Sequence, residues 1–198
     1  GDTSTITTTG AGSSGLTYQS LGGGGGYTGS TSASAQLGGL YQGTSTGSAL
    51  TLSSQIDVAT NGSDAAALLI QTLGGGGGRV GDVGSNANLG GTSSILGAPN
   101  GQAGGLEVTI NSKLTSNGDR GAGAIVQTIG GGGGWALTNS QTSTVLGSGN
   151  NARRFYGVAS GGPVTADVSG TIQTTGSTSP GFVVQTIGGG GGYAPIAS

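Results

Sequence analysis

The 198-residue sequence contains no cysteine, no histidine and no methionine. Without cysteine, neither disulfide bonds nor thiolate metal sites can hold the fold. Without histidine or cysteine, the Ser/His and Cys/His arrangements of nucleophilic catalysis cannot be assembled. A carboxylate pair, such as Asp57 with Asp64 or Asp167, would be the remaining route to catalysis, but nothing in the sequence brings two acids together. We therefore expect a protein that is not an enzyme and that binds no metal and no cofactor.

Charge is also scarce, because five basic and seven acidic residues give a net charge of only −2. Five Lys and Arg cannot neutralise many phosphates, which excludes a strongly basic nucleic-acid surface. No apolar run approaches the length of about 18 residues that a membrane helix needs, so we expect no membrane insertion by this segment. The 49 glycines are typical of a low-complexity, disordered chain. Disorder, however, normally combines low hydrophobicity with high net charge, and the net charge of −2 does not fit that combination.

A repeat orders this glycine-rich chain. Runs of five glycines begin at Gly22, Gly74, Gly130 and Gly188, at spacings of 52, 56 and 58 residues. A related phrase precedes each run: YQSL, IQTL, VQTI and VQTI. Four such phrases in one short chain are not chance. They predict a single repeat-built domain over residues 1–198, with repeat units that end near residues 26, 78, 134 and 192.

The glutamines of these phrases align the four repeats and are assigned to repeat packing: Gln19, Gln71, Gln127 and Gln185. Nine residues upstream of each glutamine stands a glycine, at positions 10, 62, 118 and 176. Eighteen residues downstream, Leu37, Leu89 and Val145 keep the same register. All the variation in repeat length then falls between these residues and the next strand, which indicates a surface loop. We expect each glutamine to hydrogen-bond local backbone, with an amide ladder between repeats as the alternative.

Apolar residues alternate within each repeat, as at Leu106, Val108 and Ile110, and this period of two predicts a strand with one buried face. A more continuous apolar run follows, such as residues 124–126, and fits a strand buried on both faces. Helices are disfavoured because glycine interrupts every stretch of helical length. The predicted fold is therefore an all-β stack of coils. Since a β-solenoid coil takes about 18–25 residues, each repeat would supply two or three coils and the chain a rod roughly 40–50 Å long.

Two phrases carry a family resemblance: ITTTGAGSSGLTYQSLGGGGG, residues 6–26, and IQTTGSTSPGFVVQTIGGGGG, residues 172–192. They resemble the glycine-rich passenger repeats of bacterial autotransporters and other large secreted adhesins, in which a Gln-Ser-Ile phrase leads into five glycines. The resemblance implies a right-handed parallel β-helix, or β-solenoid, secreted and exposed on the bacterial cell surface. It carries over no binding site, because such repeats share no ligand motif. We expect the chain to be a segment of a longer protein.

Two groups of residues are candidate contacts for a partner or a glycan. The first follows the glycine runs, where flat side chains repeated at one position would form a surface stripe, unless each covers the adjacent glycine strand: Tyr27, Arg79, Trp135 and Tyr193. The second is a basic and aromatic cluster in the longest variable loop, suited to an acidic glycan or partner chain: Arg153, Arg154, Phe155 and Tyr156. The glycine runs themselves lack the phosphate-loop motif. We expect them to let the backbone pass close to a neighbouring coil, with contact to a second molecule as the alternative.

These observations favour a non-enzymatic extracellular structural and adhesive protein, a stiff β-solenoid rod for surface attachment. The expected partners are a second copy of the chain, a host or abiotic surface, or extracellular glycans, and assembly into filaments is a variant of this function. An ice-binding solenoid is the first alternative, because Thr3, Thr5 and Thr7 alternate. A glycan-binding module is the second.

Overall fold

The computed structural model describes residues 4–28, 35–37, 45–75, 77–80, 87–89, 101–131, 133–136, 144–146, 160–188 and 191–193. Every regular element in these segments is a β-strand, and the strands pair in parallel. The prediction of an all-β protein is therefore confirmed. The parallel pairing is compatible with the expected solenoid.

The strands of the described segments form six sheets, each built from equivalent strands of successive repeats. The corner sheet contains β1 (Thr5–Thr8), β7 (Asp57–Thr60), β13 (Lys113–Ser116) and β18 (Thr171–Thr174). The central sheet contains β2 (Leu16–Leu21), β8 (Leu68–Leu73), β14 (Ala124–Ile129) and β19 (Phe182–Ile187). The glycine sheet contains β3 (Gly25–Thr28), β9 (Gly77–Val80), β15 (Gly133–Ala136) and β20 (Gly191–Tyr193).

The outer sheet has three strands: β6 (Leu50–Ser54), β12 (Leu106–Ile110) and β17 (Val164–Val168). Two small sheets complete the set. One contains β4 (Ala35–Leu37), β10 (Ala87–Leu89) and β16 (Thr144–Leu146). The other contains β5 (Ser45–Thr46) and β11 (Gly101–Gln102).

One repeat makes one coil of the chain, by which we mean the path from a strand to its neighbour in the same sheet. Gln19 pairs in register with Gln71, Gln71 with Gln127, and Gln127 with Gln185. A coil therefore takes 52, 56 or 58 residues, and the expectation of two or three coils per repeat is wrong. When the sequence is shifted against itself, the glycine runs and the apolar residues both match only at a shift of one full repeat. No shorter period brings both into register, which is why a coil takes a whole repeat. Four strands at the usual sheet spacing span roughly 15 Å, which also overturns the expected rod length.

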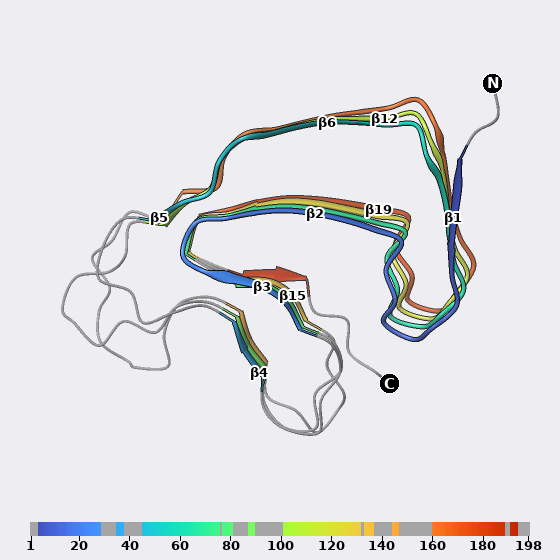
Figure 1. Ribbon diagram of the computed structural model, residues 1–198, viewed down its shortest axis with the longest axis horizontal. Helices are drawn as coiled ribbons and strands as arrows, with labels where there is room; N and C mark the ends of the chain where they lie inside the picture. The colour runs from blue at the N-terminus through green and yellow to red at the C-terminus, as the bar shows by residue number, and fades with distance from the viewer. Residues whose placement is uncertain are drawn as a thin grey trace.

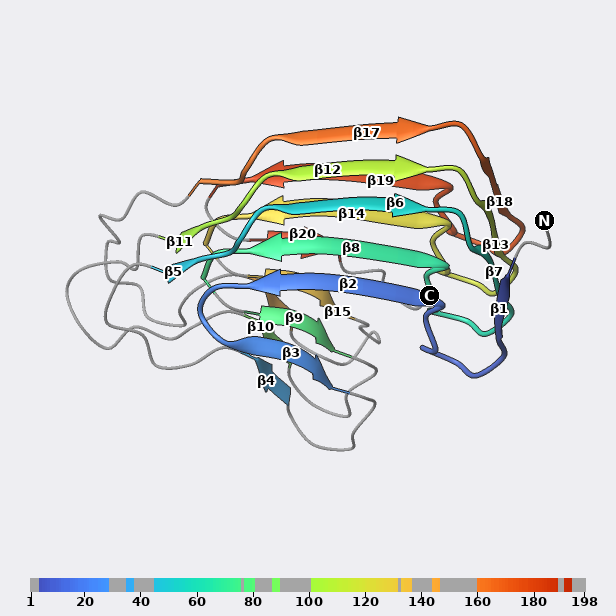
Figure 2. The ribbon, with the colours of Figure 1, turned by 45° about the horizontal axis from the view of Figure 1, so that its top comes forward.

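The sheets are arranged in layers. Viewed along the stack, successive coils superimpose, and the central sheet lies between the outer sheet and the glycine sheet (Figure 1). The corner sheet joins the outer sheet to the central sheet at one side. In the tilted view, equivalent strands rise one above another from the first repeat to the last (Figure 2).

The central sheet is buried on both faces at its two inner strands, β8 and β14, as the continuous apolar run predicts. On one face, Leu68 and Val126 pack with Val108 of the outer sheet and Leu114 of the corner sheet. On the other face, Leu69 and Ile125 pack against Trp135 of the glycine sheet. A sheet with apolar side chains on both faces must be covered on both, and this requirement places the glycine sheet over the central sheet.

The register of the small sheet corrects one feature of the repeat alignment. Leu89 pairs with Leu37 on one side and with Leu146 on the other, so Val145 is not the equivalent residue. Ala87 follows Val80 by seven positions, whereas Thr144 follows Ala136 by eight. One inserted residue therefore lies before β16, and the prediction that all length variation falls after this strand is wrong by one residue.

Candidate functional site

The residues that follow the glycine runs form a column across the glycine sheet. Tyr27 pairs with Arg79, Arg79 with Trp135, and Trp135 with Tyr193. The guanidinium carbon of Arg79 lies 4.9 Å from the centroid of the Tyr27 ring and 4.3 Å from that of the Trp135 ring. A cation within about 6 Å of an aromatic face is attracted by the ring quadrupole. The column therefore joins three successive coils through one sandwiched guanidinium.

The two inner residues of this column, Arg79 and Trp135, lie inside the protein, which corrects the expectation of a surface stripe at these two positions. Trp135 is fully buried and Arg79 is only 2% exposed, whereas Tyr27 is 57% exposed. The side chain of Trp135 packs on Ala66, Leu69, Ala122 and Ile125, between the glycine sheet and the central sheet. Arg79 and Trp135 thus cover the strands next to them. The second face of the central sheet is apolar and the glycines opposite it have no side chains, so large side chains are needed to fill the space between the two sheets. Contact with a glycan or partner at Tyr27 and Tyr193 stays a prediction.

The burial of Arg79 shapes its electrostatics. Burial lowers the pKa of the guanidinium, while nearby Tyr27 and Asp64 act in the opposite direction. Nη2 of Arg79 donates a hydrogen bond to the carbonyl oxygen of Gly12, in the turn before β2. Two aromatic rings and one carbonyl group contact the guanidinium, which suits a structural cation that fixes the stacking of the coils.

The four aligned glutamines form a second column, in which the two inner residues are buried and the two outer ones half-buried. Gln71 and Gln127 are fully buried, and neither amide atom of either side chain has a hydrogen-bond partner. These residues are neighbours on consecutive coils, yet no hydrogen bond joins their amide groups, so the alternative of an amide ladder is absent between them. The expected bond to local backbone is also absent at these two residues. Nε2 of Gln19 and Oε1 of Gln185 are likewise buried and unpaired.

The last two glycines of each run begin a strand of the glycine sheet and stack backbone on backbone. A Cβ on Gly77 would overlap the carbonyl oxygen of Gly133, and a Cβ on Gly134 would overlap that of Gly78. The φ angles of Gly77 and Gly134 are +124° and +135°, in a region that residues with a side chain avoid. Packing of the runs against neighbouring coils, the expected role, is what the structure shows.

Sequence reasoning missed an ion pair in the turn between the corner and central sheets. Arg120 and Asp64 bind each other across successive coils at 2.7 Å. The sequence does place Asp64 and Arg120, which carry opposite charges, at the same position of consecutive repeats. They become neighbours only because one whole repeat makes one coil. No group of three or more His, Cys, Asp or Glu side chains that could hold a metal ion occurs among the described residues.

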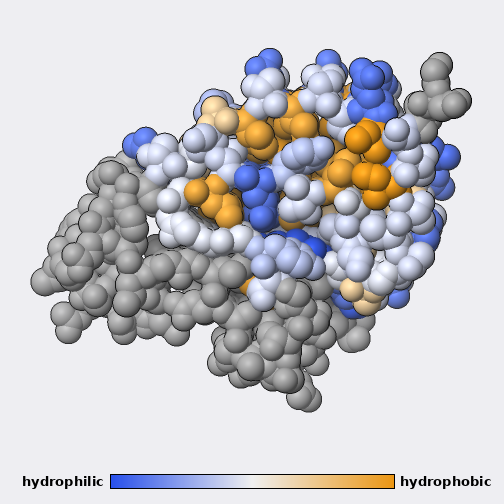
Figure 3. Space-filling view, in the orientation of Figure 1, coloured by the Kyte–Doolittle hydropathy of each residue, from blue (hydrophilic) through white to orange (hydrophobic). Residues whose placement is uncertain are grey.

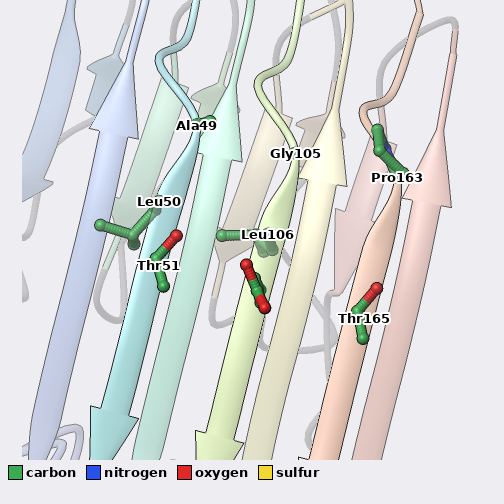
Figure 4. Close-up of a pocket in the computed structure, with 8 residues that line it drawn as sticks. Ala49, Leu50, Thr51, Gly105, Leu106, Pro163 and Thr165 are labelled. Carbon is green, nitrogen blue, oxygen red and sulfur yellow. The ribbon is translucent and has the colours of Figure 1, made fainter.

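A shallow groove of about 400 Å³ crosses the start of the three outer-sheet strands (Figure 4). Ala49, Gly105 and Pro163 occupy equivalent positions just before the three strands, and Gly105 lies in the middle. The groove lies here because glycine has no side chain to fill the space between its two neighbours. Thr51, Glu107 and Thr165 form the next row, and none of the residues that line the groove is aromatic. The second predicted contact cluster, Arg153, Arg154, Phe155 and Tyr156, lies outside the described residues.

No family model, curated protein or solved structure matches the chain. Among the described residues, no helix is long and apolar enough to cross a membrane.

Proposed function

We propose that this chain is a non-enzymatic structural segment of an extracellular adhesive protein, folded as a right-handed parallel β-solenoid with one coil per repeat and exposed on a bacterial cell surface. The observation that carries the proposal is the in-register stacking of whole repeats, with Gln on Gln and Gly on Gly in successive coils. Repeats that contact mainly their neighbours build rods rather than enclosed sites. The resemblance to adhesin passenger repeats supports the extracellular location.

The outward surface of the outer sheet fits a hydrated stalk. Thr51, Ser53, Thr109 and Thr165 are exposed there, and all four are short and polar. Short polar side chains leave no large apolar patch on this face, so it needs no permanent partner. Attachment would then fall to the variable loops, and the proposed contacts are Arg153, Arg154, Phe155 and Tyr156, with an extracellular glycan or a host or abiotic surface as partner.

The ice-binding alternative is not favoured by the register. Thr5 and Thr7 are followed in the next coil by Asp57 and Ala59, and Lys113 stands beside Asp57 in the third coil. A flat threonine array would need threonine at these positions as well. We therefore keep the structural and adhesive function as the proposal.

Force spectroscopy tests the structural half of this proposal. Pulled from its two ends, a stack that unravels coil by coil lengthens in steps of 52–58 residues, or roughly 180–210 Å of extended chain. A smooth extension curve without such steps would contradict the proposal that the chain is a stalk of stacked coils.

Surface display tests the adhesive half. Bacteria that display the chain are compared under flow, on bare and glycan-coated glass, with bacteria that display a variant carrying serine at positions 153–156. We expect more bacteria to remain on the glass when they display the parent chain. Bacteria that display the variant should not show this increase. Equal retention with and without the parent chain would overturn the adhesive role and leave the force result unaffected.

A further inference from the structure

An asparagine followed by a glycine recurs in the turn that leads from the corner sheet to the central sheet. Asn61 and Gly62 follow β7 in the second coil, and Asn117 and Gly118 follow β13 in the third. Both asparagines are exposed and both glycines are buried. In the space-filling view, hydrophilic residues gather along the right-hand edge, where Figure 1 places the corner sheet (Figure 3). The two asparagines therefore belong to inner coils of the stack and are open to solvent.

The stack itself requires the glycine that follows each asparagine. A Cβ on Gly62 would overlap the carbonyl oxygen of Gly10, and a Cβ on Gly118 would overlap that of Gly62. The overlap is with backbone atoms, so no side chain can turn away to relieve it. Contact between coils therefore fixes glycine beside both asparagines.

Glycine is the neighbour that most favours deamidation of asparagine, a thermally labile residue, because no side chain hinders the approach of its peptide nitrogen. The nitrogen of Gly62 attacks Cγ of Asn61, and the Cγ–Nδ2 bond breaks. The proton of the attacking nitrogen passes through solvent water to the leaving group, which departs as ammonia, and a succinimide ring remains. Water then opens the ring at either carbonyl carbon and gives aspartate or isoaspartate. Among the described residues, the peptide nitrogens of Gly62 and Gly118 have no hydrogen-bond acceptor that would hinder this attack.

A ladder of hydrogen bonds on the surface holds the two asparagine side chains unequally. Nδ2 of Asn117 donates to Oδ1 of Asn61 at 2.8 Å, and Oδ1 of Asn117 accepts from Oγ1 of Thr175 at 3.2 Å. Both polar atoms of Asn117 are therefore held, including the nitrogen that must leave. Asn61 is held at Oδ1 alone, and its Nδ2 has no hydrogen-bond partner in the part of the chain that the structure describes.

We propose that Asn61 is a site of spontaneous deamidation and that the ladder retards the same reaction at Asn117. Ring closure turns Cγ toward the following peptide nitrogen, so the side chain must first leave the ladder. Asn61 loses one hydrogen bond in this step and Asn117 loses two. One additional hydrogen bond of ordinary strength slows the reaction about fivefold.

The modification acts on the contact between coils. In isoaspartate the main chain runs through Cβ and Cγ, so the backbone gains one carbon directly before Gly62. Gly62 packs on the carbonyl of Gly10, and Gly118 packs on the carbonyl of Gly62. The peptide nitrogen of Asn61 also donates to the carbonyl of Thr8 in the first coil. A lengthened backbone cannot keep all three contacts, so the stack loosens first at this turn as the protein ages.

Peptide mapping of the full chain tests the proposal during incubation at mildly alkaline pH and body temperature. Cleavage after arginine and lysine separates the two sites, because Asn61 is the only asparagine of residues 1–79 and Asn117 the only one of residues 114–120. Aspartate and isoaspartate should form about fivefold faster at Asn61 than at Asn117. In urea, which removes the ladder, the two rates should be similar. If Asn61 stays intact in the folded protein, or reacts no faster than Asn117, the proposal is wrong.

Asn61→Thr is the matched variant for the effect on the stack, because threonine occupies the equivalent position in the first and fourth repeats, as Thr9 and Thr175. Urea unfolding of aged samples should show a loss of stability in the parent protein that this variant lacks. Equal losses in both proteins would show that deamidation of Asn61 does not loosen the stack.

Thr175→Val tests the ladder. Valine has the shape of threonine but lacks the hydroxyl that binds Asn117, so the rate at Asn117 should rise about fivefold, to that of Asn61. The control is Thr171→Val, at an exposed position of β18 outside the ladder, which should change neither rate. An unchanged rate at Asn117 in the Thr175→Val protein would overturn the protective role of the ladder.

Discussion

Arg120 binds Asp64 through two parallel hydrogen bonds, Nε to Oδ1 and Nη2 to Oδ2, both 2.7 Å long, although the residues are 56 positions apart in the sequence. Both residues have positive φ angles, 56° for Arg120 and 60° for Asp64. Both side chains are mostly buried. The pair therefore fastens two successive turns at a position where the backbone conformation itself disfavours a side chain.

Asp64→Asn should lower the free energy of unfolding by about 1–2 kcal/mol. Asparagine tolerates the left-handed backbone conformation. The decrease in the free energy of unfolding therefore reports the loss of the carboxylate charge from the bidentate pair and not a backbone effect. Urea unfolding measures the change, and the matched control is Asp167→Asn, an exposed carboxylate on the outer sheet. Equal effects of the two variants would show that the pair contributes no more than a surface charge.

Thr178→Gly should stabilise the fold by about 1 kcal/mol. Thr178 has a φ of 53°, at the position that Gly12 occupies in the first coil with a φ of 68°. A β-branched side chain is costly in this region, and glycine is not. The reciprocal variant, Gly12→Ala, should destabilise by a similar amount. Thermal unfolding of both proteins checks the pair, and a stabilising Gly12→Ala would contradict the account.

Arg79→Lys should destabilise the protein by about 2 kcal/mol, because an ammonium group cannot stack as a plane between Tyr27 and Trp135. Arg79→Tyr, which continues the aromatic column, should cost less. Trp135 is the only tryptophan, so its fluorescence reports unfolding of the column directly. If lysine is tolerated as well as arginine, the stacked guanidinium has no special role.

Stability should fall at alkaline pH through Tyr193. Burial raises the pKa of its phenol above the ordinary value of 10.0, and the charge of Asp64 adds to the effect. The unfolded chain then releases the proton at a lower pH than the folded chain. The stability that Tyr193 contributes is therefore complete below about pH 10 and is lost as the pH rises through the folded pKa. Urea unfolding of the parent and Tyr193→Phe between pH 8 and pH 11 isolates this residue, and parallel curves would contradict the prediction.

Gln127→Leu should leave stability unchanged or raise it, because it replaces an amide that is buried without a partner. Gln127→Glu should destabilise by about 3 kcal/mol or more at neutral pH, since it buries an unpaired charge. Chemical unfolding of both variants distinguishes this account from an amide ladder. In a ladder, the leucine variant would break two hydrogen bonds and lose stability.

The sequence alone determined the strand content and the repeat. Alternating Leu106, Val108 and Ile110 predicted a half-buried strand, the run at residues 124–126 predicted a strand buried on both faces, and both appear as expected. These features depend on periods of two residues and on glycine, which act locally along the chain. The equivalence of the four glutamines could also be determined from sequence, because each repeat carries the same phrase.

Only the tertiary structure decided how many residues make a coil, and most of the errors follow from that. Once a coil is a whole repeat, Gln71 and Gln127 become neighbours, Asp64 meets Arg120, and Arg79 lies between two rings. The sequence also left open whether the column after the glycines faces solvent. The layer arrangement answers this, because the glycine sheet covers the second apolar face of the central sheet, and the buried side chains of Trp135 and Arg79 lie there.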